Sequence, residues 1–151
     1  MSERTALSDD MAAIAFVQRS LLCKNLDGDL LTRLLSAGSL AQYGAGSVVC
    51  TEGTHDDTLF MILEGKVEIR KASAAGDVEI ATLDRPAIFG ERAVLTAHAR
   101  SATIVARVEC RLVLFPGDVI RDVANAAPKF GWLLASLMAG RTKDTEKKLG
   151  L

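Results

Sequence analysis

The residues best suited to chemistry lie in one short stretch, residues 89–103. Glu91 directly follows Gly90 there, and Arg100 stands nine positions later, directly before Ser101. A guanidinium presents a rigid fork that can hold two phosphate oxygens at once, and an ionised carboxylate accepts a hydrogen bond from a sugar hydroxyl. Glycine lets the backbone approach a sugar without a Cβ clash. These residue types at this spacing suit the binding of a phosphate diester on a sugar.

Both charged residues also have a plainer structural interpretation. Arg100 could pair with an internal carboxylate such as Glu91, because a charged group inside a sheet structure is costly unless it is paired. Glu91 could cap the short helical turn that is expected over residues 92–95, and this role is compatible with ligand binding. In either case Arg100 would help to keep Glu91 ionised. Ala93 would supply a backbone N–H to an anion, and its methyl group leaves room for a ligand.

The chain on either side of this stretch divides into three zones. Residues 8–37 have helical spacing, and Asp27 is expected to cap a second helix that ends at Gly38. The first helix is expected to bury one face, which consists of Met11, Ile14, Val17 and Leu21. The middle zone, residues 39–116, contains short β-prone runs separated by turn residues, which favours a barrel or jelly roll. The expected strands lie at residues 48–50, 59–63, 67–69, 78–80, 103–106 and 112–115.

The third zone, residues 118–149, is helical again. Pro128 is expected in the first turn of a helix. Trp132 is expected in the core or on a partner surface. The helix carries an apolar stripe formed by Phe130, Leu133, Leu134, Leu137 and Met138.

Composition sets the broad class of the protein. The chain has 151 residues, 49% hydrophobic and 25% charged, which suits one globular domain. Its net charge of -1 gives no general attraction to nucleic acid or to an anionic membrane. No apolar run approaches the length of a membrane span, and the polar start is unlike a secretory signal. The cysteines Cys23, Cys50 and Cys110 form no C-x-x-C pair, so we expect reduced, mostly buried thiols and a cytoplasmic location.

Residues 89–103 resemble the phosphate-binding cassette of the cyclic nucleotide-binding domain family, usually written F-G-E-L-A-L, a few variable residues, then P-R-A-A-T. Other landmarks follow in the family's order at residues 45–49, 52–53, 60–67 and 110–115. The resemblance implies a mainly β fold with flanking helices (α+β), in which an antiparallel β-roll or jelly roll holds the cassette. The expected segments are N-terminal helices in 1–38, the β-roll in 39–117 and C-terminal lid helices in 118–151, all within one domain.

The resemblance also implies a ligand site with neither metal nor cofactor. Arg100 and Ser101 would bind the cyclic phosphate, and Glu91 would bind the ribose 2′-hydroxyl. Arg141 either stacks on the purine through a cation–π contact or is a solvated residue at the helix end. Arg92 stands where the family commonly has leucine, and its side chain is expected to face solvent. The expected ligand-binding residues are Phe89, Gly90, Glu91, Arg92, Ala93, Arg100, Ser101, Ala102 and Arg141.

The identity of the base depends on the residue after the phosphate-binding arginine. In the resembling family, threonine at that position often favours guanine and alanine often favours adenine. Ser101 lies between these cases, because its hydroxyl can bond a guanine amino group but does not have to. The expected ligand is cyclic AMP, with cyclic GMP as the second choice.

Other function classes fit the sequence less well. A cupin-type metal enzyme needs several converging histidines, whereas His55 and His98 are expected in exposed loops. No G-x-S-x-G, H-E-x-x-H or Walker motif is present, so catalysis is not expected. No recognition helix follows the last helix, so we expect no DNA reading unless the chain is part of a longer regulator.

The expected function is therefore a stand-alone sensor that signals to an unknown protein partner by movement of its C-terminal helices. A ligand-independent interaction module is the alternative. Phe130, Trp132 and Leu137 would support a homodimer or simply close the core.

Overall fold

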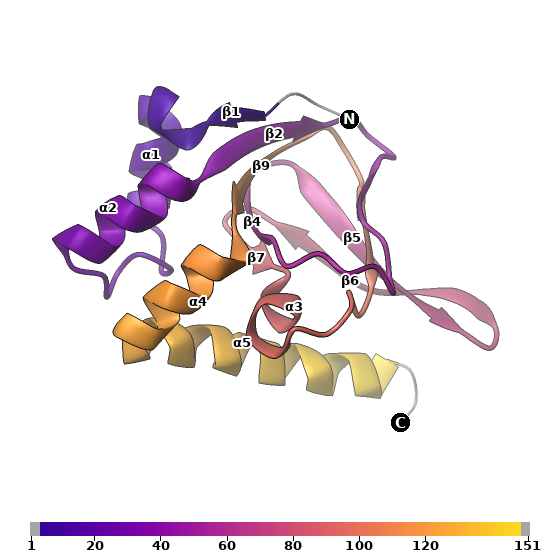
Figure 1. Ribbon diagram of the computed structural model, residues 1–151. Helices are drawn as coiled ribbons and strands as arrows, with labels where there is room; N and C mark the ends of the chain where they lie inside the picture. Colours follow the sequence, from indigo (N-terminus) through magenta and orange to yellow (C-terminus); the bar gives the residue numbers. More distant parts are fainter. Residues whose placement is uncertain (1–3, 149–151) are drawn as a thin grey trace.

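Two antiparallel sheets form the centre of the computed structural model, which describes residues 4–148 (Figure 1). The first sheet has the strand order β1-β2-β9-β4-β7, and the second has the order β3-β8-β5-β6. The expected β-roll with flanking helices is confirmed. Residues 1–3 and 149–151, at the ends of the first and last expected segments, lie outside the described residues. The strands are β1 (Arg4–Ala6), β2 (Ser39–Tyr43), β3 (Val48–Cys50), β4 (Leu59–Glu64), β5 (Lys66–Ser73), β6 (Gly76–Asp84), β7 (Ile88–Phe89), β8 (Thr103–Ala106) and β9 (Cys110–Phe115).

Strand β4 contributes to both apolar cores of the molecule. Its alternate side chains Phe60 and Ile62 lie in the core between the two sheets. Leu59, Met61 and Leu63 point the other way and pack in the core that the helices cover. All five are at most 5% exposed. Burial on both faces explains why this strand is a continuous apolar run rather than an alternating one.

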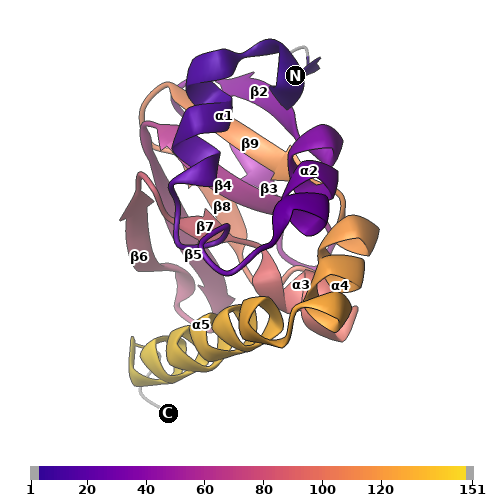
Figure 2. The same cartoon turned by 90° about the vertical axis from the view of Figure 1, so that its left-hand side faces the viewer.

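The N-terminal helices cover the outer side of the first sheet (Figure 2). They are α1 (Met11–Gln18) and α2 (Gly28–Ala37), and a short 3-10 turn (Leu7–Asp9) precedes them. Asp27 caps α2 as expected, because its Oδ1 accepts a hydrogen bond from the N–H of Leu30 at 3.1 Å. Strand β1, which pairs with β2, was not expected from the sequence.

The expected apolar face of α1 is partly wrong. Val17 is fully buried, but Met11 is 80% exposed and Leu21, which lies beyond the end of the helix, is 70% exposed. The eight residues of α1 are apolar almost all the way round. Spacing alone therefore could not identify the buried side of this helix.

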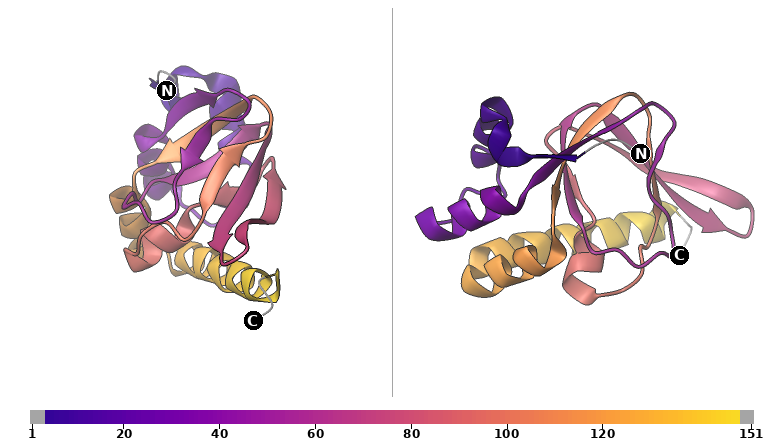
Figure 3. Two further views of the ribbon diagram at one scale, coloured as in Figure 1. Left: turned by 90° about the vertical axis from the view of Figure 1, so that its right-hand side faces the viewer. Right: turned by 45° about the horizontal axis from the view of Figure 1, so that its top comes forward.

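Two C-terminal helices complete the fold, α4 (Gly117–Ala126) and α5 (Pro128–Lys148). Helix α5 begins at Pro128 as expected and lies across one end of the roll, where it packs on α3 (Glu91–Thr96) and α4 (Figures 2 and 3). Phe130 and Leu134 are buried in the core, whereas Trp132 is 74% exposed, so a core position for Trp132 is wrong. No helix within residues 4–148 combines the length and the apolar character that crossing a membrane requires.

Candidate functional site

The turn from β7 into α3 depends on a glycine. Gly90 has a φ of 92°, in the left-handed region that favours glycine. A Cβ at this position would lie 2.7 Å from Nη1 of Arg100 and 2.8 Å from the carbonyl oxygen of Thr58. Glycine is thus required both by the backbone conformation and by the close approach of the arginine. The helix that follows extends one residue beyond the expected turn at each end.

Arg100 is held inside the roll by the loop between β3 and β4. Its backbone N–H donates to the carbonyl oxygen of Thr54, and its own carbonyl oxygen accepts from the N–H of Gly53, both at 2.8 Å. Its side chain is only 5% exposed, and the guanidinium lies over the ring of Phe60, 5.5 Å from the ring centroid. The arginine is therefore fixed by its backbone as well as by its side chain.

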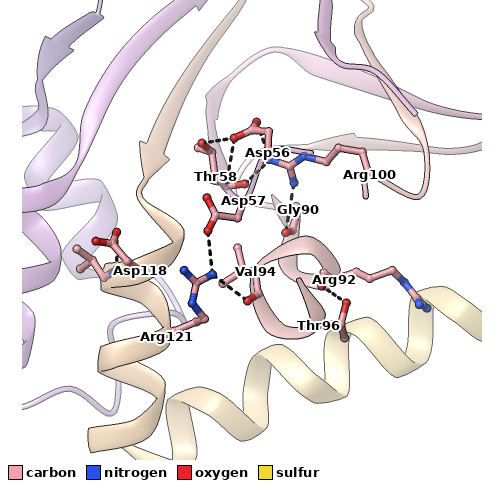
Figure 4. Close-up of polar contacts among 11 residues, drawn as sticks. Asp56, Asp57, Thr58, Gly90, Arg92, Val94, Thr96, Arg100, Asp118 and Arg121 are labelled. Atoms are coloured by element: carbon pink, nitrogen blue, oxygen red, sulfur yellow. Dashed lines mark hydrogen bonds and ion pairs between the residues drawn. The ribbon is translucent and has the colours of Figure 1, made fainter. Parts of the chain in front are cut away.

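The guanidinium of Arg100 has partners for only some of its donors. Nη2 donates to Oδ2 of Asp56 at 2.9 Å and to the carbonyl oxygen of Thr58 at 2.8 Å (Figure 4). Nη1 makes a long contact of 3.4 Å with the carbonyl oxygen of Gly90. Nε is buried and has no hydrogen-bond partner among the described residues. A buried donor without an acceptor is costly, which marks a place where a ligand oxygen could bind.

The carboxylate that pairs with Arg100 differs from the expected one. Asp56 takes this role, and no contact between Arg100 and Glu91 is found within residues 4–148. Partial burial raises the pKa of the Asp56 carboxyl, but its hydrogen bonds with Arg100 and Thr58 lower the pKa by more, so the net value lies below the usual 3.8. Asp56 is ionised at neutral pH and balances the charge of the arginine.

Glu91 is paired with helix α5 instead. Nη1 of Arg141 donates to both carboxylate oxygens of Glu91, at 2.7 and 2.9 Å, and its Nη2 donates to the carbonyl oxygen of Ile88 at 2.5 Å. Glu91 is 4% exposed. Arg141, rather than Arg100, is therefore the cation that pairs with this carboxylate. The expectation that Arg141 is a solvated residue is wrong, and its guanidinium contacts the cassette.

Arg92 makes a second link to the lid helix. Its Nη2 donates to Oγ1 of Thr142, and this hydroxyl donates in turn to the carbonyl oxygen of Met138 at 3.0 Å. Figure 4 shows the Arg92 side chain extending along α5. The side chain is half-buried in this interface, so the expectation that it faces solvent is wrong.

These residues surround a cavity of about 430 Å³, a size typical of small-molecule sites. One wall is the sheet β3-β8-β5-β6, which presents Cys50, Ile69, Ile80 and Leu83, and helix α5 closes the opposite side with Met138, Arg141 and Thr142. Burial raises the pKa of the Cys50 thiol to about 11, so it is a neutral part of the wall.

All nine residues that the sequence assigned to the site line this one cavity. That they bind a ligand stays a prediction. Sequence reasoning missed Asp56, Thr142 and Lys71. Lys71 shares the inward face of β5 with Val67 and Ile69, four and two positions earlier, so alternation along the strand could have identified it.

A second arginine–aspartate pair lies beside the first and reaches helix α4. Nη1 of Arg121 donates to Oδ2 of Asp57 at 2.8 Å and to the carbonyl oxygen of Val94, in α3, at 3.3 Å (Figure 4). The adjacent residues Asp56 and Asp57 thus bind arginines from two different parts of the chain. The loop between β3 and β4 therefore contacts both Arg100 in the cavity and helix α4, which leads into α5.

Comparison with known proteins gives a consistent result. A family model described as cyclic nucleotide-binding domain matches residues 40–127. The chain is 32% identical to cGMP-dependent protein kinase 2 of Mus musculus over 150 residues, which cover 96% of this chain but only 19% of the kinase. It is 29% identical over 125 residues to the cAMP-activated global transcriptional regulator Vfr of Pseudomonas aeruginosa, covering 80% of this chain and 58% of the regulator.

A solved structure of a cyclic nucleotide-binding domain from Methylobacillus flagellatus has the same fold. It superposes with a TM-score of 0.74 at 22% identity, and the match covers 99% of this chain and 86% of that one.

Proposed function

Because this chain belongs to the cyclic nucleotide-binding domain family, we propose that its cavity binds cyclic AMP or cyclic GMP and that the signal leaves through helix α5. The observation that carries this proposal is the state of Arg100. Its guanidinium is buried, and its Nε lacks a partner among the described residues. The oxygens of a cyclic phosphate would supply acceptors for Nε and for Nη1.

The remaining cassette residues have roles that follow from their chemistry. Glu91 accepts a hydrogen bond from the ribose 2′-hydroxyl, and a carboxylate has lone pairs for this in addition to its contact with Arg141. Gly90 leaves the space that the sugar and the arginine require. Ser101 offers a backbone N–H and a hydroxyl to the phosphate. Ala93 lines the cavity with only a methyl group.

Arg141 acts on the sugar side of the site rather than by stacking on the base. It holds Glu91 by both oxygens while its own helix covers the cavity. A ligand that contacts Glu91 would then favour the closed position of α5, to the extent that it binds this position better than an open one. We propose that a protein partner recognises this change in α5 and that the domain binds its ligand without transforming it.

Whether the site prefers adenine or guanine is a separate question. The kinase and the regulator that this chain resembles are named for cyclic GMP and cyclic AMP respectively. Ser101 lies between the residues typical of each nucleotide, and cyclic AMP is the ligand expected from the sequence. A second polar residue, Lys71, also lines the cavity, so both nucleotides belong in the test.

Calorimetric titration of ligand-stripped protein with cyclic AMP, cyclic GMP and the acyclic 5′-AMP tests the proposal. We expect at least one cyclic nucleotide to bind and 5′-AMP to bind far more weakly, because the cavity suits a single diester charge. Hydrogen exchange should show slower exchange in residues 128–148 when the cyclic nucleotide is bound. Failure of both cyclic nucleotides to bind would favour the ligand-independent interaction module. Binding without any effect on α5 would refute the signalling route.

A further inference from the structure

The polar side chains of the cavity are not all free to contact a base. Arg141 is engaged by Glu91, and Arg92 is engaged by Thr142, whose hydroxyl hydrogen is used on the carbonyl of Met138. Arg100 is the proposed partner of the phosphate. The polar side chains that remain among the described lining residues are Lys71 and Ser101.

Lys71 is positioned beside Ser101 by contacts from two directions. Its Nζ donates to the carbonyl oxygen of Ser101 at 2.6 Å and lies 3.6 Å from Oε2 of Glu52. Glu52 is itself fixed, because its Oε1 accepts a hydrogen bond from the N–H of Ala72 at 2.9 Å. The Lys71 side chain is 28% exposed. The ammonium group is thus held at the cavity wall, next to the residue that follows the phosphate-binding arginine.

An ammonium group donates three hydrogen bonds and accepts none. Two of these donors are directed to Ser101 and Glu52, which leaves one for a group inside the cavity. The hydroxyl of Ser101, in contrast, can accept as well as donate. Lys71 and Ser101 therefore present, close to each other, a fixed donor and a hydroxyl that can either donate or accept.

We propose that Lys71 selects the base and that it favours guanine over adenine. This inference rests on the proposed function. Guanine has two acceptors on one edge, O6 and N7, whereas adenine has N7 but carries the donor N6–H₂ in place of O6. The Lys71 ammonium bonds O6 of guanine, and the Ser101 hydroxyl accepts from the guanine amino group. With adenine, a donor would face the ammonium, and the amino group that Ser101 contacts is absent.

This assignment places cyclic GMP ahead of cyclic AMP and reverses the order expected from the sequence, in which cyclic AMP came first. A hydrogen bond to a charged group contributes roughly ten- to hundredfold in affinity. Because Lys71 is partly exposed, the expected preference for guanine over adenine lies near the lower end of this range, at about tenfold.

Three nucleotides separate the contributions of the two residues. Cyclic GMP has both O6 and the amino group, cyclic IMP has O6 without the amino group, and cyclic AMP has neither. We expect the unaltered chain to bind cyclic GMP and cyclic IMP about tenfold more tightly than cyclic AMP in calorimetric titrations. This comparison needs no variant and is therefore independent of any effect of mutation on folding.

The variant Lys71→Met keeps the length of the side chain and removes the charge. It should weaken the binding of cyclic GMP and cyclic IMP by about tenfold and bring the ratio of cyclic IMP to cyclic AMP close to one, while the contact of Ser101 with the amino group still favours cyclic GMP. Lys66→Met is the matched control, because Lys66 lies exposed on the same strand, is not among the residues that line the cavity, and should leave the ratio as it is.

Several outcomes would overturn the assignment. Equal or tighter binding of cyclic AMP by the unaltered chain contradicts it, as does a preference for cyclic IMP over cyclic AMP that survives Lys71→Met. Weak binding of cyclic IMP with tight binding of cyclic GMP would assign the base to Ser101 instead. If none of the three nucleotides binds, the proposed function itself is wrong, which differs from a failure of base selection alone.

Discussion

Replacing Arg100 with methionine should abolish tight ligand binding while the fold remains almost as stable as before. Two donors of the guanidinium are available to a phosphate, Nε, which has no partner among the described residues, and Nη1, which has only the 3.4 Å contact with Gly90. Two hydrogen bonds to a charged group contribute about 3–6 kcal/mol together. Their loss corresponds to a decrease in affinity of about two to four orders of magnitude.

The effect on stability is small because two contributions oppose each other. The substitution removes the donor that the Thr58 carbonyl now uses, which costs about 1–3 kcal/mol if the carbonyl stays unpaired. It also removes the buried, unpaired Nε, which relieves a penalty of about the same size. Asp56 is 47% exposed, so water can solvate its carboxylate once the pair is gone. We expect the free energy of unfolding to change by less than about 1.5 kcal/mol.

Two measurements on Arg100→Met test whether Arg100 serves ligand binding or stability. They are calorimetric titration with both cyclic nucleotides and urea unfolding without ligand. Arg33→Met is the matched control, since Arg33 also pairs with an aspartate, Asp122, but on the exposed surface, and should change neither quantity. Affinity within tenfold of the unaltered chain would refute the role of Arg100 in phosphate binding. A loss of stability above about 4 kcal/mol would show that Arg100 is mainly structural.

Three further outcomes follow from the geometry of the site. Gly90→Ala should destabilise the fold by about 1–3 kcal/mol in urea unfolding and weaken ligand binding. The control Gly46→Ala, at a residue with a similar φ of 85° but with open space around it, should lower the free energy of unfolding by less and leave binding intact. Equal effects of the two variants would contradict the clash with Arg100. Burial raises the pKa of the Cys50 thiol to about 11 from 9.0, so its thiolate population at pH 8 is about a hundredfold smaller than that of a free thiol. Alkylation by iodoacetamide, followed by mass spectrometry, should therefore be slow at pH 8, faster toward pH 11 and slower with nucleotide bound. Rapid labelling at pH 8 would contradict this expectation. Pairing with Arg100 lowers the pKa of Asp56 below 3.8 in the folded state, so its contribution to stability is present above pH 3.8 and is lost as the pH falls through the folded-state pKa. Asp56→Asn should therefore make the free energy of unfolding depend less on pH at acid pH. An unchanged pH dependence would count against the Asp56–Arg100 pair.

Apart from Arg141, the parts of the site that the sequence predicted are close together in the chain. Glu91, Arg100 and Ser101 fall within one turn and loop, so the backbone alone brings them to the same place, and all of them line the cavity. The partners of these residues come from far away in the sequence. Asp56 lies 44 positions from Arg100, and Arg141 lies 50 positions from Glu91. No local pattern indicates which carboxylate meets which arginine: the alternative that paired Arg100 with Glu91 is wrong, and no carboxylate partner was predicted for Arg141.

The fold was predictable where side-chain periodicity is clear and unpredictable where it is absent. The longer apolar runs predicted β3, β4, β5, β6, β8 and β9, and α2 was predicted from its cap Asp27 and the regular apolar stripe after it, whereas β1, β2 and β7 were missed. Helix α1 has no polar face to orient it, and Met11 was placed in the core although it is 80% exposed. Of the two positions expected for Trp132, the core position is wrong, because Phe130 and Leu134 occupy the buried side of α5 and Trp132 is 74% exposed.

Three consecutive residues connect the phosphate side of the cavity with its lid. The carbonyl of Gly90 contacts Arg100, the carboxylate of Glu91 is bound by Arg141, and the side chain of Arg92 donates to Thr142. Since these residues form the turn and the first positions of α3, none of them can move far without the others. A ligand that bonds both Arg100 and Glu91 therefore acts on one short rigid segment whose other contacts belong to α5. The cavity and helix α5 can be coupled in this way without any change in the sheets, because the residues proposed to bind the ligand are also those that hold the helix.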